Sequence, residues 1–212
     1  MIPSRFVVGV GMGTETSEPR VRGSRIATMR EVACEVWGSE AISTLVARLD
    51  AEARAAFEDP TRLPEWVPAH LQIAWGSAIL TSLCGERTDD GSFLCFIAEV
   101  TRRGFGQMGE LFTSLGSPAL VLRRANDLWH FENSTGKLTY APLTPTSGRV
   151  TLRDHPLALS RPMQIAMTDA FRYVLVMCGV AWATATYDAG KDGALHVNVA
   201  WGEGSRSPGS RI

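Results

Sequence analysis

The segment KLTYAPLTPTSGRVTLR, residues 137–153, marks the place where the hydrophobic pattern of the chain changes. Polar and apolar residues alternate in residues 137–140 and again in 149–153. Successive side chains of a strand point to opposite faces, so this alternation predicts two strands, each with one apolar face. The residues between them are rich in proline, threonine, serine and glycine, which favour turns. The segment therefore predicts a β-hairpin.

A second hairpin is expected near the end of the chain. Alternating runs cover residues 181–187 and 194–201, and the turn-forming sequence DAGKDG separates them. A helix is expected between the two hairpins, because apolar residues recur at spacings of three and four over residues 162–178 and Gly179 follows as a helix end. The second half of the chain therefore predicts four antiparallel strands and one helix.

The sequence from residue 22 to the first hairpin has helical spacing. Its apolar residues recur every three or four positions, and Ser24 and Ser117 are the expected N-caps of two helices. Prolines on either side of Trp66 predict a loop there. The expected fold class is α+β, with N-terminal helices and one helix of the C-terminal half packed on a four-stranded antiparallel sheet. The expected helices cover residues 24–37, 39–49, 50–57, 68–83, 92–104, a stretch that ends near 115, and 118–129.

Composition and charge limit the classes of protein to consider. The chain has 212 residues, of which 45% are hydrophobic and 20% charged, and its formal net charge is −1. These values predict one globular domain, residues 22–201, between a flexible leader, 1–21, and a flexible tail, 202–212. The near-zero charge offers no field that would gather nucleic acid or anionic lipid. Without a membrane span, a signal peptide or paired cysteines, we expect a cytoplasmic protein with no nucleic-acid or membrane partner.

No motif in the chain has the specificity of a catalytic or metal signature. Gly9, Gly11 and Gly13 follow an apolar run, but their G-x-G-x-G spacing and the lack of an expected helix after them argue against a dinucleotide site. The four histidines lie apart from each other and from the cysteines, which argues against zinc. No serine lies in a G-x-S-x-G sequence. We therefore assign no catalytic residue, no metal ligand and no cofactor.

The aromatic residues of the second half supply a candidate ligand site. Six tryptophans are many for this length, and most are expected in the core because an indole needs a large buried environment. A subset of aromatic residues would suit an apolar pocket between the helices and the sheet. Two histidines flank the first hairpin, where an imidazole is commonly exposed but would suit acid-base chemistry or haem ligation beside a cavity. The candidate ligand-binding residues are Trp129, Phe131, Tyr140, Tyr173, Met177, His130 and His155.

Several short motifs of the second half of the chain can be compared with known families. They are SP at 117–118, ANDLW at 125–129, STGKL at 134–138, RVTL at 149–152, MCG at 177–179 and HVNVAW at 196–201. These motifs resemble an uncharacterised family of myxobacterial proteins of similar length, and the resemblance spans residues 22–201. That family is similar to the superfamily of 4-vinyl-reductase domains, haem nitric-oxide-binding sensors and transport-complex subunits. The resemblance implies helices packed on an antiparallel sheet, small hydrophobic ligands and frequent dimers.

Two departures from these relatives weaken the expectation of a cofactor. The Tyr-x-Ser-x-Arg motif with which the nitric-oxide sensors contact haem is absent, and ALH at 194–196 stands where relatives often have a cysteine. Haem therefore has only weak support. We expect a non-enzymatic sensory domain of a signalling protein that binds a small apolar molecule as a homodimer. The alternatives are a scaffold with a filled core that binds a protein partner, and an enzyme that uses His130 or His155 with a carboxylate.

Overall fold

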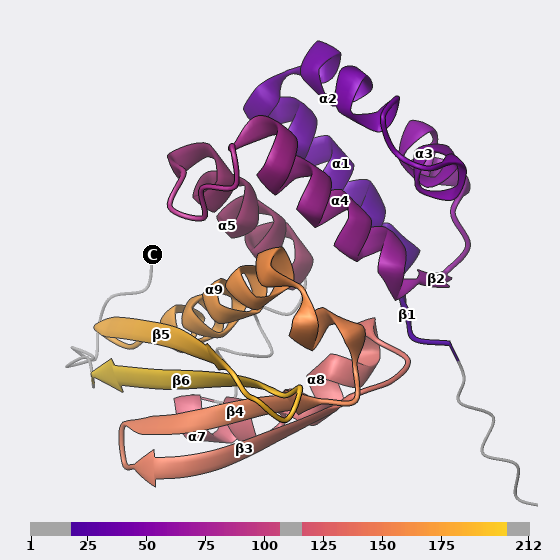
Figure 1. The fold of residues 1–212 in the computed structure, drawn as a ribbon. Coiled ribbons are helices and arrows are strands. Elements are labelled where there is room, and N and C mark those ends of the chain that lie inside the picture. Colours follow the sequence, from indigo (N-terminus) through magenta and orange to yellow (C-terminus); the bar gives the residue numbers. More distant parts are fainter. Residues whose placement is uncertain (1–17, 107–115, 203–212) are drawn as a thin grey trace, which may run out of the picture.

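A four-stranded antiparallel sheet confirms both expected hairpins (Figure 1). The computed structural model describes residues 18–106 and 116–202. The strand order is β3-β4-β6-β5, so β6 lies between the two strands that precede it in the sequence. The strands are β3 (Lys137–Thr144), β4 (Ser147–Arg153), β5 (Trp182–Ala189) and β6 (Leu195–Gly202).

The alternating sequence gives this sheet one apolar and one polar face. Buried residues alternate with half-buried ones along the whole of β6, and the buried Val197 lies opposite the buried Val150 of β4. On the other face, His196 Nδ1 lies 3.0 Å from Thr151 Oγ1. His196 is therefore on the outer face of the sheet, as its position in the strand predicts.

One long helix, α9 (Arg161–Met177), lies between the sheet and the helices of residues 23–106 (Figure 1). It contacts β5 and β6 on one side and α4 (Ala69–Leu83) and α5 (Gly91–Gly106) on the other. The chain leaves the helix where Gly179 has a φ of +77°, which glycine adopts without the clash of a Cβ atom. The helix α9 thus packs against both the sheet and the helical layer.

Most helices occur where the apolar spacing predicts them. Asp50 Oδ1 accepts from the Ala53 amide at 2.8 Å and caps α3, and Asp90 Oδ1 accepts from the amides of Ser92 and Phe93 at 2.9 and 3.1 Å where α5 begins. The α+β class is confirmed. The helices are α1 (Gly23–Trp37), α2 (Ser39–Val46), α3 (Ala51–Glu58), α4 (Ala69–Leu83), α5 (Gly91–Gly106), α7 (Pro118–Arg123) and α8 (Ala125–Glu132), with single 3₁₀ turns η1 (Pro60–Arg62) and η2 (Pro156–Leu159).

The region around Trp66 differs from the expected loop. Its residues form a short strand, β2 (Trp66–Pro68), that pairs with β1 (Arg20–Arg22). The guanidinium of Arg22 lies 4.4 Å from the Trp66 ring centroid, and Arg22 Nε donates to the carbonyl of Phe131 at 2.9 Å. These contacts join segments that are distant in sequence, so no local pattern could have predicted the pairing.

The strand β1 begins before the expected start of the domain. It begins at Arg20, ahead of residue 22, and Val21 is fully buried in the core. Most of the expected leader, 1–21, and of the expected tail, 202–212, lies outside the described residues. The division of the chain into leader, domain and tail therefore stays a prediction.

Several helix ends differ from the expectations. The helix α1 begins at Gly23 without a side-chain cap, so Ser24 is not its N-cap. Ser117 occupies the N-cap position of α7, but its side chain makes no capping hydrogen bond. The single helix expected over 118–129 is divided into α7 and α8 because Arg124 has φ −92° and ψ 4°, outside the helical region. The helix expected to end near residue 115 lies outside the described residues.

The turn between α8 and β3 is built around Trp129. The indole Nε1 donates to the carbonyl of Thr135 at 2.7 Å, and the Asn133 amide donates to the carbonyl of Trp129 at 3.1 Å. Gly136 follows with a φ of +87° and packs against the indole. A Cβ atom at this position would lie 2.8 Å from the Cβ of His155 and 3.1 Å from Trp129 Nε1. Glycine is therefore required here by both backbone conformation and space.

The variant Gly136→Ala should lower the free energy of unfolding by about 3 kcal/mol, because it adds a steric clash to the strain of a left-handed alanine. Gly38→Ala is the matched control. Gly38 has a φ of +85°, but no atom of the described residues lies within 4 Å of the place that an added methyl group would occupy, so only strain is added. Urea unfolding of both variants measures the difference. Equal losses would contradict the close packing at Gly136.

Candidate functional site

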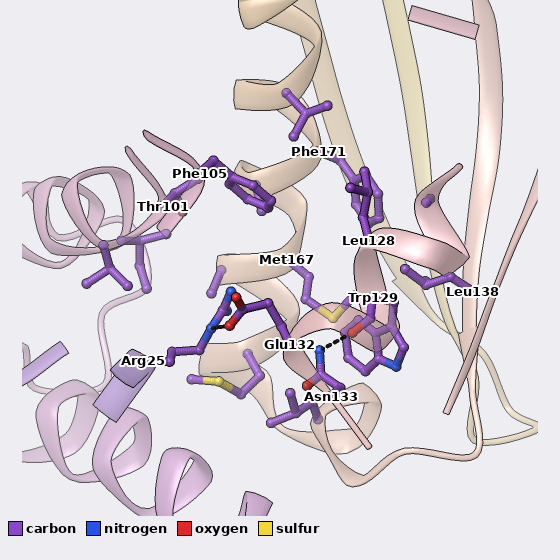
Figure 2. A pocket seen from close by; sticks show the side chains of 18 of the residues that line it. Arg25, Thr101, Phe105, Leu128, Trp129, Glu132, Asn133, Leu138, Met167 and Phe171 are labelled. Carbon is purple, nitrogen blue, oxygen red and sulfur yellow. Dashed lines mark hydrogen bonds and ion pairs between the residues drawn. The ribbon is translucent and has the colours of Figure 1, made fainter. Parts of the chain in front are cut away.

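A cavity of about 120 Å³ lies among the helices, between α5, α8 and α9 (Figure 2). Leu138 of β3 is the point at which the sheet contributes to its wall. Most of the lining is apolar. Its apolar side chains include Phe96, Val100 and Phe105 of α5, Leu128 and Trp129 of α8, and Met163, Ala166, Met167, Ala170 and Phe171 of α9.

The volume results from small side chains on the helical face that turns toward the cavity. Ala166 and Ala170 lie one turn apart on α9, and Ala125 begins α8. Side chains three or four positions apart lie on the same side of a helix, so the two alanines of α9 leave one continuous space. Larger side chains at these positions would fill it.

Three polar side chains of the lining lie together at one end of the cavity. In Figure 2, Arg25, Glu132 and Asn133 lie near one another, and Phe105 and Phe171 lie toward the other end. Arg25 Nε is 3.5 Å from Glu132 Oε2, and each side chain is largely shielded, with 30% and 18% of its surface exposed. The opposite charges compensate each other. This end of the cavity therefore carries no net charge from the pair.

Trp129 forms part of the cavity wall, and the ring of His155 packs against its indole. The two ring centroids are 5.0 Å apart with an interplanar angle of 88°, an edge-to-face arrangement. His155 is buried, and its Nδ1 accepts from the Leu157 amide at 3.3 Å. Because one nitrogen accepts, the neutral ring carries its proton on Nε2. Burial lowers the pKa of His155 to about 4, so the imidazole is neutral at physiological pH.

The other candidate residues lie away from the cavity lining. Phe131 and His130 are exposed on α8, and Tyr140 of β3 is half-buried over Gly148. Tyr173 and Met177 are half-buried near the end of α9. Of the seven candidates, the structure places Trp129 in the wall and His155 in contact with it. A ligand-binding role for the seven residues stays a prediction.

Gln72 was not among the expected site residues, although it lines the cavity from α4 and is only 4% exposed. A signal for it was present. Gln72 precedes Trp75 by three positions and Ile79 by seven, so it occupies the apolar stripe of its helix. A polar residue in such a stripe needs a hydrogen-bond partner in the interior, so this pattern indicates a buried polar position.

The fold is similar to that of haem nitric oxide/oxygen-binding (H-NOX) domains. An Fe(II) unliganded H-NOX protein from K. algicida matches with a TM-score of 0.66 and 10% identity, over 87% of this chain and 98% of that one. A structure concerned with haem distortion in the H-NOX family matches with a TM-score of 0.54 and 12% identity, over 90% of this chain and 98% of that one. An oxygen-binding H-NOX domain related to soluble guanylate cyclases, in its oxygen complex, matches with a TM-score of 0.51 and 12% identity. The match covers 85% of this chain and 94% of that one.

These matches confirm the distant likeness to haem-binding sensory domains at the level of the fold. No family model and no curated protein matches the chain. The resemblance to the myxobacterial family therefore stays a prediction. No helix of residues 18–106 and 116–202 is both long enough and apolar enough to cross a membrane.

The cavity of this chain does not fit haem. Haem iron is held by histidine, cysteine, tyrosine, or methionine together with histidine, and the described lining contains none of the first three. Its volume of about 120 Å³ is also below the roughly 300–1,000 Å³ of pockets for drug-sized ligands. Among the described residues, no group of three or more His, Cys, Asp or Glu side chains could hold a metal ion. The absence of any cofactor stays a prediction.

The stability of the protein should depend on pH through His155. The unfolded histidine has a pKa of about 6.5 and the folded one of about 4, so the unfolded chain binds an extra proton between these values. The free energy of unfolding should therefore fall by about 3 kcal/mol from this residue as the pH drops from 7 to 4.

His155→Gln tests this dependence, because glutamine does not titrate and its side-chain oxygen can replace Nδ1 as an acceptor. Urea unfolding of the natural protein and the variant at pH values from 4 to 7 gives both profiles. The natural protein should lose more stability than the variant over this range. Parallel profiles would contradict the assignment of a buried neutral imidazole.

Proposed function

We propose that this chain, which has the fold of H-NOX domains, is a non-enzymatic sensory domain that binds one small apolar molecule in the cavity between α5, α8 and α9. The observation that carries the proposal is the cavity itself, because a scaffold with a filled core would have none. Protein interiors are otherwise packed as densely as organic crystals, and empty volume reduces stability. A chain that keeps such a volume in a ligand-binding fold is best explained by an occupant.

The volume indicates the size of the occupant. Engineered cavities of about 150 Å³ lined by leucine, isoleucine and phenylalanine bind benzene. The cavity here is about 120 Å³ and is lined mostly by aliphatic and aromatic side chains. A single aromatic ring is therefore a suitable occupant, and a porphyrin is far too large for the cavity as it stands.

The position of the cavity suggests how occupancy would be signalled. Met167 and Phe171 line it from α9, and the opposite side of α9 contacts β5. A ligand that moves these side chains would act on the helix that supports the edge strand of the sheet. A change of the sheet surface on binding is the expected output, since coupling needs an element that both sites contact.

The enzyme hypothesis has less support from the geometry. His155 Nδ1 is used in a backbone hydrogen bond, and its Nε2 has no hydrogen-bond partner among the described residues, so none of their carboxylates activates it. His130 is exposed on α8. The scaffold hypothesis requires a contiguous apolar patch. The large exposed apolar side chains are distributed over separate elements, among them Leu143 of β3, Leu159 of η2 and Trp182 of β5.

The homodimer and the cytoplasmic location are also part of the proposal. They rest on the sequence and on the likeness to domains that dimerise. Sedimentation velocity at several protein concentrations measures the oligomeric state, and a single monomeric species throughout would exclude the dimer.

Benzene should raise the melting temperature of the natural protein, and Ala166→Leu should abolish this effect by filling the cavity. Ala55→Leu is the matched control, because Ala55 is exposed on α3 and the substitution adds the same atoms outside the cavity. At benzene concentrations one hundredfold above Kd, binding should add about 2.7 kcal/mol to the stability of the natural protein and of the control. No response in the natural protein, or an equal response in Ala166→Leu, would contradict the proposal.

Met167→Ala should enlarge the cavity and extend binding to a two-ring compound such as naphthalene. The free variant should lose about 2 kcal/mol of stability, because the removed side chain leaves unfilled volume. Isothermal titration with naphthalene measures the change in ligand size. A variant that binds naphthalene no better than the natural protein would show that Met167 does not limit the cavity.

A further inference from the structure

An acceptor without a partner among the described residues lies at the cavity. Only 4% of the surface of Gln72 is exposed, and its Oε1 has no hydrogen-bond partner in the described part of the chain. The residue lines the cavity from α4. A buried amide oxygen left without a donor typically costs about 1–3 kcal/mol, so most such atoms in proteins are paired. An occupant of the cavity that supplies a donor would remove this cost.

Gln72 reaches the cavity from α4, and no other residue of α4 is part of the described lining. Its neighbour one turn further along α4, Gly76, packs against Met163 near the beginning of α9. In Figure 2, Arg25, Glu132 and Asn133 lie near one another, while Thr101 of α5 lies near Phe105. The polar residues of the lining thus come from several elements.

Three other polar side chains of the lining are already compensated. Arg25 and Glu132 form an ion pair, and the Asn133 amide donates to the Trp129 carbonyl at 3.1 Å. A charged ligand would bring an uncompensated charge into a largely apolar space, which is unfavourable. Gln72 Oε1 is a fully buried lining atom without a hydrogen-bond partner among the described residues, so it can select a ligand with a neutral donor.

We propose that the cavity binds a neutral aromatic molecule of about the size of phenol, with one O–H or N–H group that donates to Gln72 Oε1. This inference rests on the proposed function, because it requires that the cavity takes up a ligand. It adds the chemical class of that ligand. The ring would lie against apolar side chains such as Phe105 and Phe171, and the donor would face α4.

Four probes of similar size separate the possibilities: phenol, with a donor; anisole, with an acceptor alone; toluene, with neither; and benzoate, with a charge. Their Kd values for the full chain are measured by isothermal titration. Phenol should bind about five- to tenfold more tightly than toluene, the gain that one hydrogen bond to a buried acceptor provides. Anisole and benzoate should bind no better than toluene.

Gln72→Met removes the acceptor and keeps a similar volume. This variant should lose the preference for phenol over toluene and should bind toluene at least as tightly as the natural protein. Gln164→Met is the matched control. Gln164 is also a buried glutamine on a helix, but its amide donates to the Ala158 carbonyl at 2.7 Å and it is not part of the described cavity lining. Its variant should keep the preference for phenol.

The outcomes distinguish the two levels of the proposal. If none of the probes binds the natural protein, the proposed function fails. If toluene and phenol bind equally, or if Gln72→Met keeps the preference, the ligand class is wrong and the proposed function stands. Tighter binding of anisole would mean that the amide presents its NH₂ group, and tighter binding of benzoate that the cavity recognises a charge; either result would overturn the inference. Circular dichroism and urea unfolding confirm that each variant is folded before titration.

Discussion

The hydrogen bond from the Trp129 indole to the Thr135 carbonyl fixes the place where the helical part of the chain becomes the sheet. One such bond contributes about 1 kcal/mol to stability, but the geometry that it sets has wider effects. It orients the indole so that one side forms a cavity wall and the other meets His155. It also brings the backbone so close that Gly136 is required in the turn. The strand β3 begins at Lys137, directly after this turn.

The sequence predicted those elements whose signal is repeated along one segment. The strands β4 and β6 alternate strictly, and α9 keeps its apolar residues on one face, so each was expected within a few residues of its observed bounds. The pairing of β1 with β2 could not be predicted in this way. It depends on contacts such as Arg22 on Trp66, between segments that no periodic pattern connects.

The candidate site was predictable only in part, because a cavity is a property of several elements at once. Trp129 lies in the wall of the cavity, but the aromatic residues near it in sequence are not part of the described lining. The wall is completed by small side chains such as Ala166 and by Gln72, which carry little signal one at a time. The same fold in H-NOX domains is associated with haem, while the described lining of this cavity lacks histidine, cysteine and tyrosine. The fold therefore sets where a ligand can be placed, and the lining decides which one.

The position of β6 in the sheet has a consequence for how the protein is made. Because β6 pairs with both β4 and β5, the sheet joins the β3-β4 hairpin to β5 only after residues 195–202 have been synthesised. Chains emerge from the ribosome N-terminus first, at about 5–20 residues per second, and until then the edges of β4 and β5 are open. The unpaired N–H and C=O groups of such edges can pair with strands of other chains. The last strand to be synthesised is therefore the one that covers the open edges of both β4 and β5.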